Sequence, residues 1–353
     1  MSIHNKRKRN RVILILIILT LVIGFVGLLI RSPERGNAFN ELSKCTNEIE
    51  VQKVWETYAD QQFNDLDFEN KTREKLSSFN LSLVKINACL NWLPPTPTHL
   101  NLIVIPDLSN RISNPNEFPG QYDRDLVIMR TIWKTFVAFV GTRESKHQMA
   151  ITPTYNTNVN SGLSKNVNNL FADMNGKVNN PQHIFFTPYR TTKFNSNSRE
   201  IYEYAFDNPI ASDFYTFFKS DLESFLKSPT LYDNYKNKLI IITDGKIIND
   251  MGGGATEITK YKEKFMSASN KDSLIRCITD NGLNLRPVEI DWTNTETLIC
   301  EISGGTSNSG FYTEVLSAYW EDWFSKMNCP IKTLKSSRPE QMVCNQIKVF
   351  IEQ

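Results

Sequence analysis

The longest apolar run in the chain lies close to its beginning, at Val12–Ile30, where Thr20 is the only polar residue among 19. A helix of this length spans roughly 28 Å at about 1.5 Å per residue, which matches the hydrocarbon thickness of a bilayer. A helix of a soluble core would show a polar face, and this segment has none. The pattern therefore predicts an uncleaved transmembrane anchor at residues 12–30.

A cleaved signal peptide is the alternative interpretation of the same run. Its apolar stretch is longer than the usual signal-peptide core, and no small-residue cleavage site precedes Arg31-Ser32-Pro33. No cysteine follows that could carry a lipoprotein anchor. The anchor remains the favoured prediction.

The apolar positions after the anchor change their period near residue 97. Residues 31–97 form a preface whose segment Glu41–Leu93 has a mostly helical pattern, and Pro94, Pro95 and Pro97 end it because proline cannot continue a helix. Between residues 98 and 328 short apolar runs alternate with longer amphipathic stretches, which is typical of a layered α/β fold. We expect a doubly wound, mostly parallel sheet there, with residues 329–353 as a C-terminal extension.

The pattern within 98–328 predicts individual elements. The five runs expected as strands are Leu100–Ile105, Gln148–Ile151, His183–Phe186, Lys238–Gly245 and Leu283–Ile290. The three stretches with apolar residues at steps of three and four, expected as helices, are Tyr122–Val140, Ser212–Leu226 and Thr313–Met327. The Asn-rich stretch Tyr155–Asn180 is expected to be a long polar loop.

Charge divides the chain at the apolar run. Residues 1–11 carry five basic and no acidic residues, while the whole chain has 40 basic and 38 acidic ones, which leaves 35 against 38, or −3, for the rest. The positive-inside rule then places residues 1–11 in the cytoplasm and the body outside it, in the periplasm if the source is a Gram-negative bacterium. A slightly acidic body excludes a nucleic-acid-coating protein, and 40% hydrophobic residues exclude wholesale disorder.

The six cysteines permit full pairing in an oxidising space, although fifteen connectivities are open. Nearness in the sequence favours Cys45 with Cys89 and Cys329 with Cys344. The alternative is that Cys89 and Cys277, which have apolar neighbours, are free buried thiols. The cysteine spacing and the four histidines do not match a zinc, thioredoxin-like or His-rich metal site.

Two predicted strands end in aspartate, at Asp107 and Asp244. Ligands of open parallel sheets bind beyond the carboxyl ends of the strands, and oxygen ligands converging there suit Mg²⁺ or Ca²⁺. The plainer alternative is that these aspartates, with Ser109 and Ser212, only cap turns and helices.

Asp107-Leu108-Ser109-Asn110-Arg111 and Thr243-Asp244-Gly245 resemble the metal-ion-dependent adhesion site of the von Willebrand factor A (vWA) domain. That family uses Asp-x-Ser-x-Ser after the first strand, a Thr in a later loop and an Asp after the fourth strand. The resemblance extends over about Leu100–Met327 and implies a vWA fold. The metal ligands that it implies here are Asp107, Ser109, Ser212 and Asp244, with Thr191 and Thr192 as alternatives to Ser212.

Arg111 departs from the family pattern, because it stands where the family has a metal-ligating Ser. A guanidinium cannot coordinate a cation and repels one at close range. Arg111 could instead pair with Asp107 or Asp244 and replace the cation by a salt bridge, while Ser113 would take its place only if the loop re-routes. Both a Mg²⁺ or Ca²⁺ site and a metal-free site therefore stay open.

Together, the predicted anchor and the resemblance lead us to expect a membrane-anchored, extracytoplasmic module that binds a protein partner through the rim around Asp107, Ser109, Ser212 and Asp244. If the resemblance holds, a partner carboxylate would complete any metal shell. A Mg²⁺-dependent phosphohydrolase is the first alternative. Against it, Ser109 stands where such enzymes need a second Asp, and the chain has no Gly-x-Ser-x-Gly elbow. An inert structural subunit of an envelope assembly is the second alternative.

Overall fold

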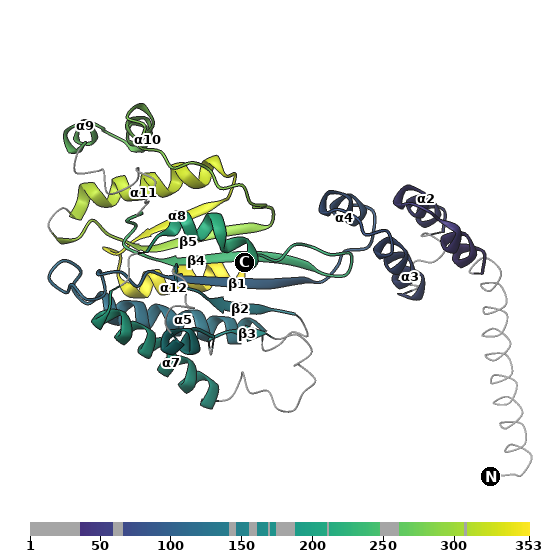
Figure 1. The fold of residues 1–353 in the computed structure, drawn as a ribbon, viewed down its shortest axis with the longest axis horizontal. Helices are drawn as coiled ribbons and strands as arrows, with labels where there is room; N and C mark the ends of the chain where they lie inside the picture. Colours follow the sequence, from purple (N-terminus) through teal and green to yellow (C-terminus); the bar gives the residue numbers. More distant parts are fainter. Residues whose placement is uncertain are drawn as a thin grey trace, which may run out of the picture. The chain divides into compact units, whose positions relative to one another are not determined.

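The computed structural model describes residues 36–353 except 59–65, 141–145, 155–160, 169, 174–187, 210–211, 248–260 and 307–308. The expected anchor at residues 12–30 and the expected strand His183–Phe186 lie outside the described residues. Within the described ranges, no helix combines the length and the apolar character that a membrane crossing requires. The chain divides into two compact units, one reaching Thr96 and including Pro229–Asn234, the other made of Pro97–Ser228 and Tyr235–Gln353 (Figure 1).

The first unit contains the helices α2 (Glu48–Tyr58), α3 (Leu66–Ser77) and α4 (Leu83–Leu90). The Trp55 ring stacks on Phe68 at 5.5 Å between centroids, within an apolar core of its own. Buried Arg73 donates hydrogen bonds to the carbonyl oxygens of Pro94, at 2.8 Å, and Leu231. These bonds fix the proline-rich end of the unit.

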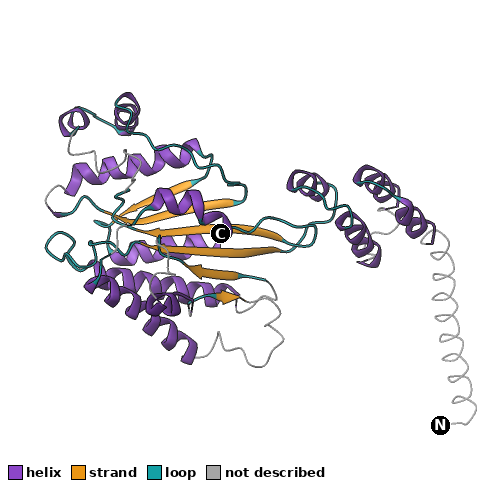
Figure 2. Ribbon diagram, viewed as in Figure 1, coloured by secondary structure: helices purple, strands orange, loops and turns teal. Residues whose placement is uncertain are grey.

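The second unit is an α/β layer structure built on a six-stranded, mostly parallel sheet with the order β3-β2-β1-β4-β5-β6 (Figure 2). Pairs β1–β2, β4–β5 and β5–β6 are parallel, and the short β3 is antiparallel to its neighbour β2. The strands are β1 (Thr98–Pro106), β2 (Gln148–Ile151), β3 (Ala172–Asp173), β4 (Asn234–Ile242), β5 (Thr295–Ile302) and β6 (Ile331–Lys335).

Helices cover both faces of this sheet, as Figure 1 shows. One face packs against α5 (Gln121–Val140), α6 (Ser161–Asn168), α7 (Pro188–Asp207) and α12 (Glu340–Glu352). The other face carries α8 (Phe214–Ser220), the 3-10 turn η3 (Leu222–Ser224), α9 (Lys262–Met266), α10 (Lys271–Asp280) and α11 (Ser309–Lys326). Because successive strand residues point to opposite faces, Leu102 and Val104 enter the first core while Ile103 and Ile105 enter the second.

Several expectations need correction. The stretch Leu283–Ile290 forms no strand; its leucines are buried in the second core, but Pro287 has no N–H to give to a ladder. The strand in this part of the chain is β5, which the sequence reading missed because threonines and glutamates interrupt its apolar residues. Within Tyr155–Asn180, expected as a loop, the described residues include α6 and β3.

The C-terminal segment and one helix also differ from expectation. Residues 329–353, expected as an extension, supply β6 and α12 of the second unit. The helix expected over Ser212–Leu226 is divided into α8 and η3. Asp213 caps α8 by accepting a hydrogen bond from the Thr216 N–H, so this N-terminal signal works through one residue of the pair Ser212-Asp213.

The six cysteines are all free, and five of them are buried. The pairs Cys45–Cys89 and Cys329–Cys344, chosen for nearness in the sequence, are therefore not disulfides. Cys89 is a buried free thiol, as the alternative held, whereas Cys277 is only partly buried. Burial raises the pKa of the Cys89 thiol, so it stays protonated and unreactive at neutral pH.

The contact between α5 and α7 gives a test of this packing. Phe194 stacks on Trp133 at 4.6 Å between ring centroids, and the Trp133 indole donates a 3.0 Å hydrogen bond to Thr191. We expect Phe194→Ala to lower the free energy of unfolding by about 3–5 kcal/mol through the cavity it leaves, measured by urea denaturation followed by Trp fluorescence.

Tyr189→Ala is the matched control, because Tyr189 lies on the same helix with 67% of its surface exposed. Its effect should stay within about 0.5 kcal/mol. Equal losses for the two variants would contradict the packing of α7 against α5.

Candidate functional site

The candidate site lies where β1 and β4 end side by side, at the point where the strand order of the sheet reverses. The Asp107 N–H donates to the Ile242 carbonyl oxygen at 2.9 Å, and the Thr243 N–H donates to the Cys300 carbonyl oxygen at 3.0 Å. These bonds continue the sheet by one residue past each strand, so that the next side chains emerge from its edge. In doubly wound sheets this switch point is the usual place for a ligand.

Asp107 is the centre of the hydrogen bonding and is almost fully buried. Its Oδ1 accepts from the Ser212 hydroxyl at 2.6 Å and from the Ser109 N–H at 2.9 Å, while its Oδ2 accepts from the Thr243 hydroxyl at 2.7 Å. The loop before α8 thus joins the ends of β1 and β4 through one carboxylate. Both carboxylate oxygens are occupied by donors of the chain itself.

Asp244 is buried one residue beyond Thr243. Its Oδ1 accepts from the Lys246 N–H at 2.9 Å, and the Lys246 ammonium lies 3.4 Å from Oδ2. Burial and the negative charge of Asp107 raise the pKa of Asp244 to about 6, although Lys246 opposes the shift. Gly245 makes this turn possible: its φ is +93°, and a Cβ there would lie 3.1 Å from Ile302.

Arg111 is fully buried beneath these two aspartates. Its Nη2 pairs with Asp125 of α5 and donates a 3.1 Å hydrogen bond to the Ile242 carbonyl oxygen, and its Nε lies 3.6 Å from Asp107 Oδ2. Burial alone would lower the pKa of the guanidinium, but Asp125 and Asp107 outweigh burial and raise it. Arg111 therefore remains a cation that is paired with two carboxylates, while its Nε and Nη1 find no hydrogen-bond acceptor among the described residues.

A second, partly buried ion pair adjoins the first. Arg124 binds Glu301 with two hydrogen bonds of 2.8 Å, and Gln121 bridges the pairs, donating to Asp125 at 2.8 Å and to Glu301 at 3.0 Å. Glu301 has a φ of +72°, an unusual conformation for a residue other than glycine. Burial raises the pKa of Asp125 to about 7 against the lowering effect of Arg111.

The structure brings together Asp107, Ser212 and Asp244 of the predicted set. Ser109 contributes its backbone N–H, and Thr243 adds a hydroxyl that the prediction did not include. The alternatives to Ser212 lie elsewhere: the Thr191 hydroxyl accepts from Trp133, and the Thr192 hydroxyl donates to the Pro188 carbonyl at 3.0 Å.

Ser113 does not replace Arg111, since its hydroxyl bonds the Asn110 carbonyl at 3.3 Å. Asp125 and Glu301 were missed by sequence reasoning. A signal existed for Asp125, a carboxylate beside the apolar stripe of the predicted helix, but its partner 14 residues earlier could not be read from the pattern.

These residues do not fit a divalent cation as they are folded. Both oxygens of Asp107 already accept hydrogen bonds, and Arg111 and Lys246 place two positive charges within 3.6 Å of the aspartates. In the described parts of the chain no three His, Cys, Asp or Glu side chains form a group suited to holding a metal ion. The guanidinium neutralises the carboxylates in the way a cation would.

No protein-family model matches this sequence, and no curated protein is significantly similar to it. The likeness to the vWA domain consequently rests on the strand-end residues and the doubly wound sheet.

The buried pair of Arg111 and Asp125 gives a thermodynamic test. Arg111→Met should lower the free energy of unfolding by about 3–5 kcal/mol, because it leaves buried carboxylates without their counter-charge. Arg111→Met combined with Asp125→Asn should recover a large part of this loss in the same urea denaturation. Strictly additive losses in this double-mutant cycle would show that the two residues are not coupled.

The raised pKa of Asp244 predicts a pH dependence of stability. The folded-state pKa of about 6 exceeds the ordinary 3.8, so folding favours the protonated form of Asp244. The contribution of this group to the free energy of unfolding is therefore fully present below about pH 4 and is lost as the pH rises through 6. Asp244→Asn should accordingly be more stable than the wild type at pH 8, by on the order of 2–3 kcal/mol, with the difference shrinking towards pH 4. A difference that is constant between pH 4 and 8 would contradict the shift.

Proposed function

We propose that the protein is a membrane-anchored, extracytoplasmic binding module of the vWA kind, which engages a protein partner at the rim around Asp107, Ser109, Ser212 and Asp244 without a metal ion. The observation that carries the proposal is the buried Arg111, which pairs with Asp107 and Asp125 where the resemblance calls for a metal ligand. Its charge stabilises the aspartates permanently, so the rim would keep its shape in any cation concentration.

The rim is stiff, which favours binding. The loop after β1 is fastened at one side by Arg111 and at the other by Thr306, whose N–H and hydroxyl bond the carbonyls of Glu117 and Asn116, each at 3.1 Å. A surface that is already ordered loses little conformational entropy when a partner docks. Asn110 and Asn116 are exposed around it, Lys246 is partly exposed, and these residues would make the contacts.

A phosphohydrolase is less well supported by the same geometry. An attacking carboxylate must reach substrate with a free oxygen, whereas Asp107 is buried and both its oxygens accept hydrogen bonds. His99 and His147 lie at the opposite, amino end of β1, where His147 accepts from the Leu100 N–H at 2.7 Å. Neither can serve as a general base for Ser212.

The location in the cell follows from the sequence argument. Residues 12–30 would cross the membrane, the basic residues 1–11 would stay in the cytoplasm, and both folded units would lie outside it. The slightly acidic body is then the part that meets the partner.

Photo-crosslinking in the source cell tests the proposal. The photoreactive residue benzoylphenylalanine is placed at Asn110 or Asn116 on the rim, and at exposed Thr98 or Asn284 away from it as matched controls. We expect the rim positions to give one defined protein adduct, with equal yield in EDTA and in millimolar Mg²⁺ or Ca²⁺. The adduct is detected by mass shift on denaturing gels.

Two outcomes would count against the proposal. Adducts that form equally at the control positions, or at no position, would favour an inert structural subunit. An adduct that EDTA abolishes would show that a cation belongs to the site after all.

A further inference from the structure

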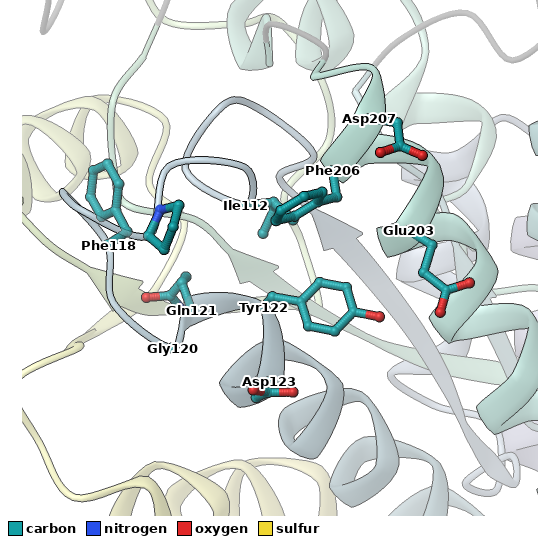
Figure 3. A pocket seen from close by; sticks show the side chains of 10 residues that line it. Ile112, Phe118, Gly120, Gln121, Tyr122, Asp123, Glu203, Phe206 and Asp207 are labelled. Atoms are coloured by element: carbon teal, nitrogen blue, oxygen red, sulfur yellow. The ribbon is translucent and has the colours of Figure 1, made fainter.

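A pocket of about 440 Å³ lies beside the strand-end site, between the loop after β1, the first turn of α5 and the last turns of α7 (Figure 3). The loop contributes Ile112 and Phe118, α5 contributes Tyr122, and α7 contributes Phe206. Gln121, which bonds Asp125 of the Arg111 network, also lines it. The pocket and the rim are therefore two parts of one surface, shaped by the same loop.

The wall of the pocket is apolar and aromatic. Tyr122 packs edge-on against Phe206 at 6.4 Å between ring centroids and against Tyr202 at 6.3 Å. Phe206 nevertheless leaves 47% of its surface exposed. An aromatic ring exposed at a pocket of this size offers an apolar side chain a place to be buried.

Three exposed carboxylates, Asp123, Glu203 and Asp207, surround this wall, as Figure 3 shows. Glu203 and Asp207 lie one turn apart on the same face of α7. Among the residues that the structure describes, none forms an ion pair with these three. Burial raises the pKa of the Tyr122 hydroxyl and the charge of Glu203 raises it further, while Arg199 and Arg130 oppose this, so the carboxylates act on the pocket wall.

The positions of Glu203 and Asp207 do not stabilise α7, the helix that contains them. They occupy the last two turns of α7, where the helix dipole favours positive charge and disfavours negative charge. A positively charged ligand at this place would relieve the repulsion and complement the dipole. The chemistry of the pocket is therefore an apolar cleft with an unpaired negative edge.

We infer that this pocket binds a segment of the partner protein in which an aliphatic or aromatic side chain is flanked by Lys or Arg. The apolar side chain would lie between Ile112, Tyr122 and Phe206, and the basic residues would pair with Glu203, Asp207 and Asp123. That the occupant is a protein rests on the proposed function.

A small free amine is a weaker fit to the same features. The carboxylates are exposed to water, where a single ion pair contributes little. A polypeptide segment covers the apolar wall and pairs with two or three carboxylates at once, so several small contributions add.

Direct binding of defined peptides tests the inference, with the full-length chain in nanodiscs of zwitterionic lipid. Three fluorescent nine-residue peptides have Gly and Ser flanks and a central Lys-Leu-Lys, Glu-Leu-Glu or Lys-Ser-Lys. We expect Lys-Leu-Lys to bind at least about fivefold more tightly than the other two by fluorescence anisotropy. Its binding should weaken when the salt is raised from about 50 to 300 mM.

Variants locate the binding. Glu203→Gln with Asp207→Asn should lower the affinity for Lys-Leu-Lys about fivefold, and Phe206→Ala by a similar factor. Glu223→Gln with Asp280→Asn is the matched control, because it removes two exposed charges elsewhere on the same unit, and it should leave the affinity unchanged. Equal affinity for the three peptides, or equal losses in the control and pocket variants, would overturn the inference.

A competition arm separates a protein segment from a small cation. Millimolar n-butylamine should not displace the Lys-Leu-Lys peptide, and full displacement would overturn the choice of a protein occupant. If the rim crosslinks form but no peptide binds selectively, the pocket inference fails while the proposed function stands. If the peptide binds selectively and the rim gives no adduct, the failure lies with the proposed function.

Discussion

Arg111 is the residue on which the arrangement of the strand-end region depends. A guanidinium buried away from water is tolerated only if its charge is matched by nearby carboxylates or other acceptors. Here the match comes from three separate parts of the chain: Asp107 after β1, Asp125 on α5 and the Ile242 carbonyl at the end of β4. The ends of β1 and β4 and the helix α5 therefore all contact the same buried guanidinium. If one of them moved away, an unpaired charge would remain in the core.

Hydrogen bonds of Asp107 and Asp125 connect this ion pair to two further parts of the chain. Asp107 accepts a hydrogen bond from Ser212 in the loop before α8. Asp125 accepts one from Gln121, which also donates to Glu301. The loop between Arg111 and Gln121 is consequently fixed at both of its ends. One side of this loop forms the proposed protein-binding rim, and the other side forms the wall of the acidic pocket, so an ion pair that no ligand can reach sets the shape of both surfaces.

The fold was predictable wherever a local pattern carries the information. The strands β1 and β4 each contain a buried apolar run, at residues 102–105 and 239–242, because both faces of the sheet are covered, and α5 has an apolar stripe of ordinary helical period. The hydrophobic pattern predicted the wrong element where apolar residues are buried outside strands, or where a buried strand contains polar residues. Leu283 and Leu285 are buried in a connection that is neither helix nor strand, while β5 mixes threonine and glutamate into a buried strand.

The sequence by itself determined that Asp107 and Asp244 each follow a strand, because strand-end position is a local property that an apolar run followed by a carboxylate reveals. It also determined the charge asymmetry between residues 1–11 and the rest of the chain. Only the tertiary structure decided what Arg111 does, since its partner Asp125 lies on the following helix, and their distance depends on how that helix packs. A pairwise electrostatic interaction varies with separation and burial, and neither quantity is written in the order of the residues.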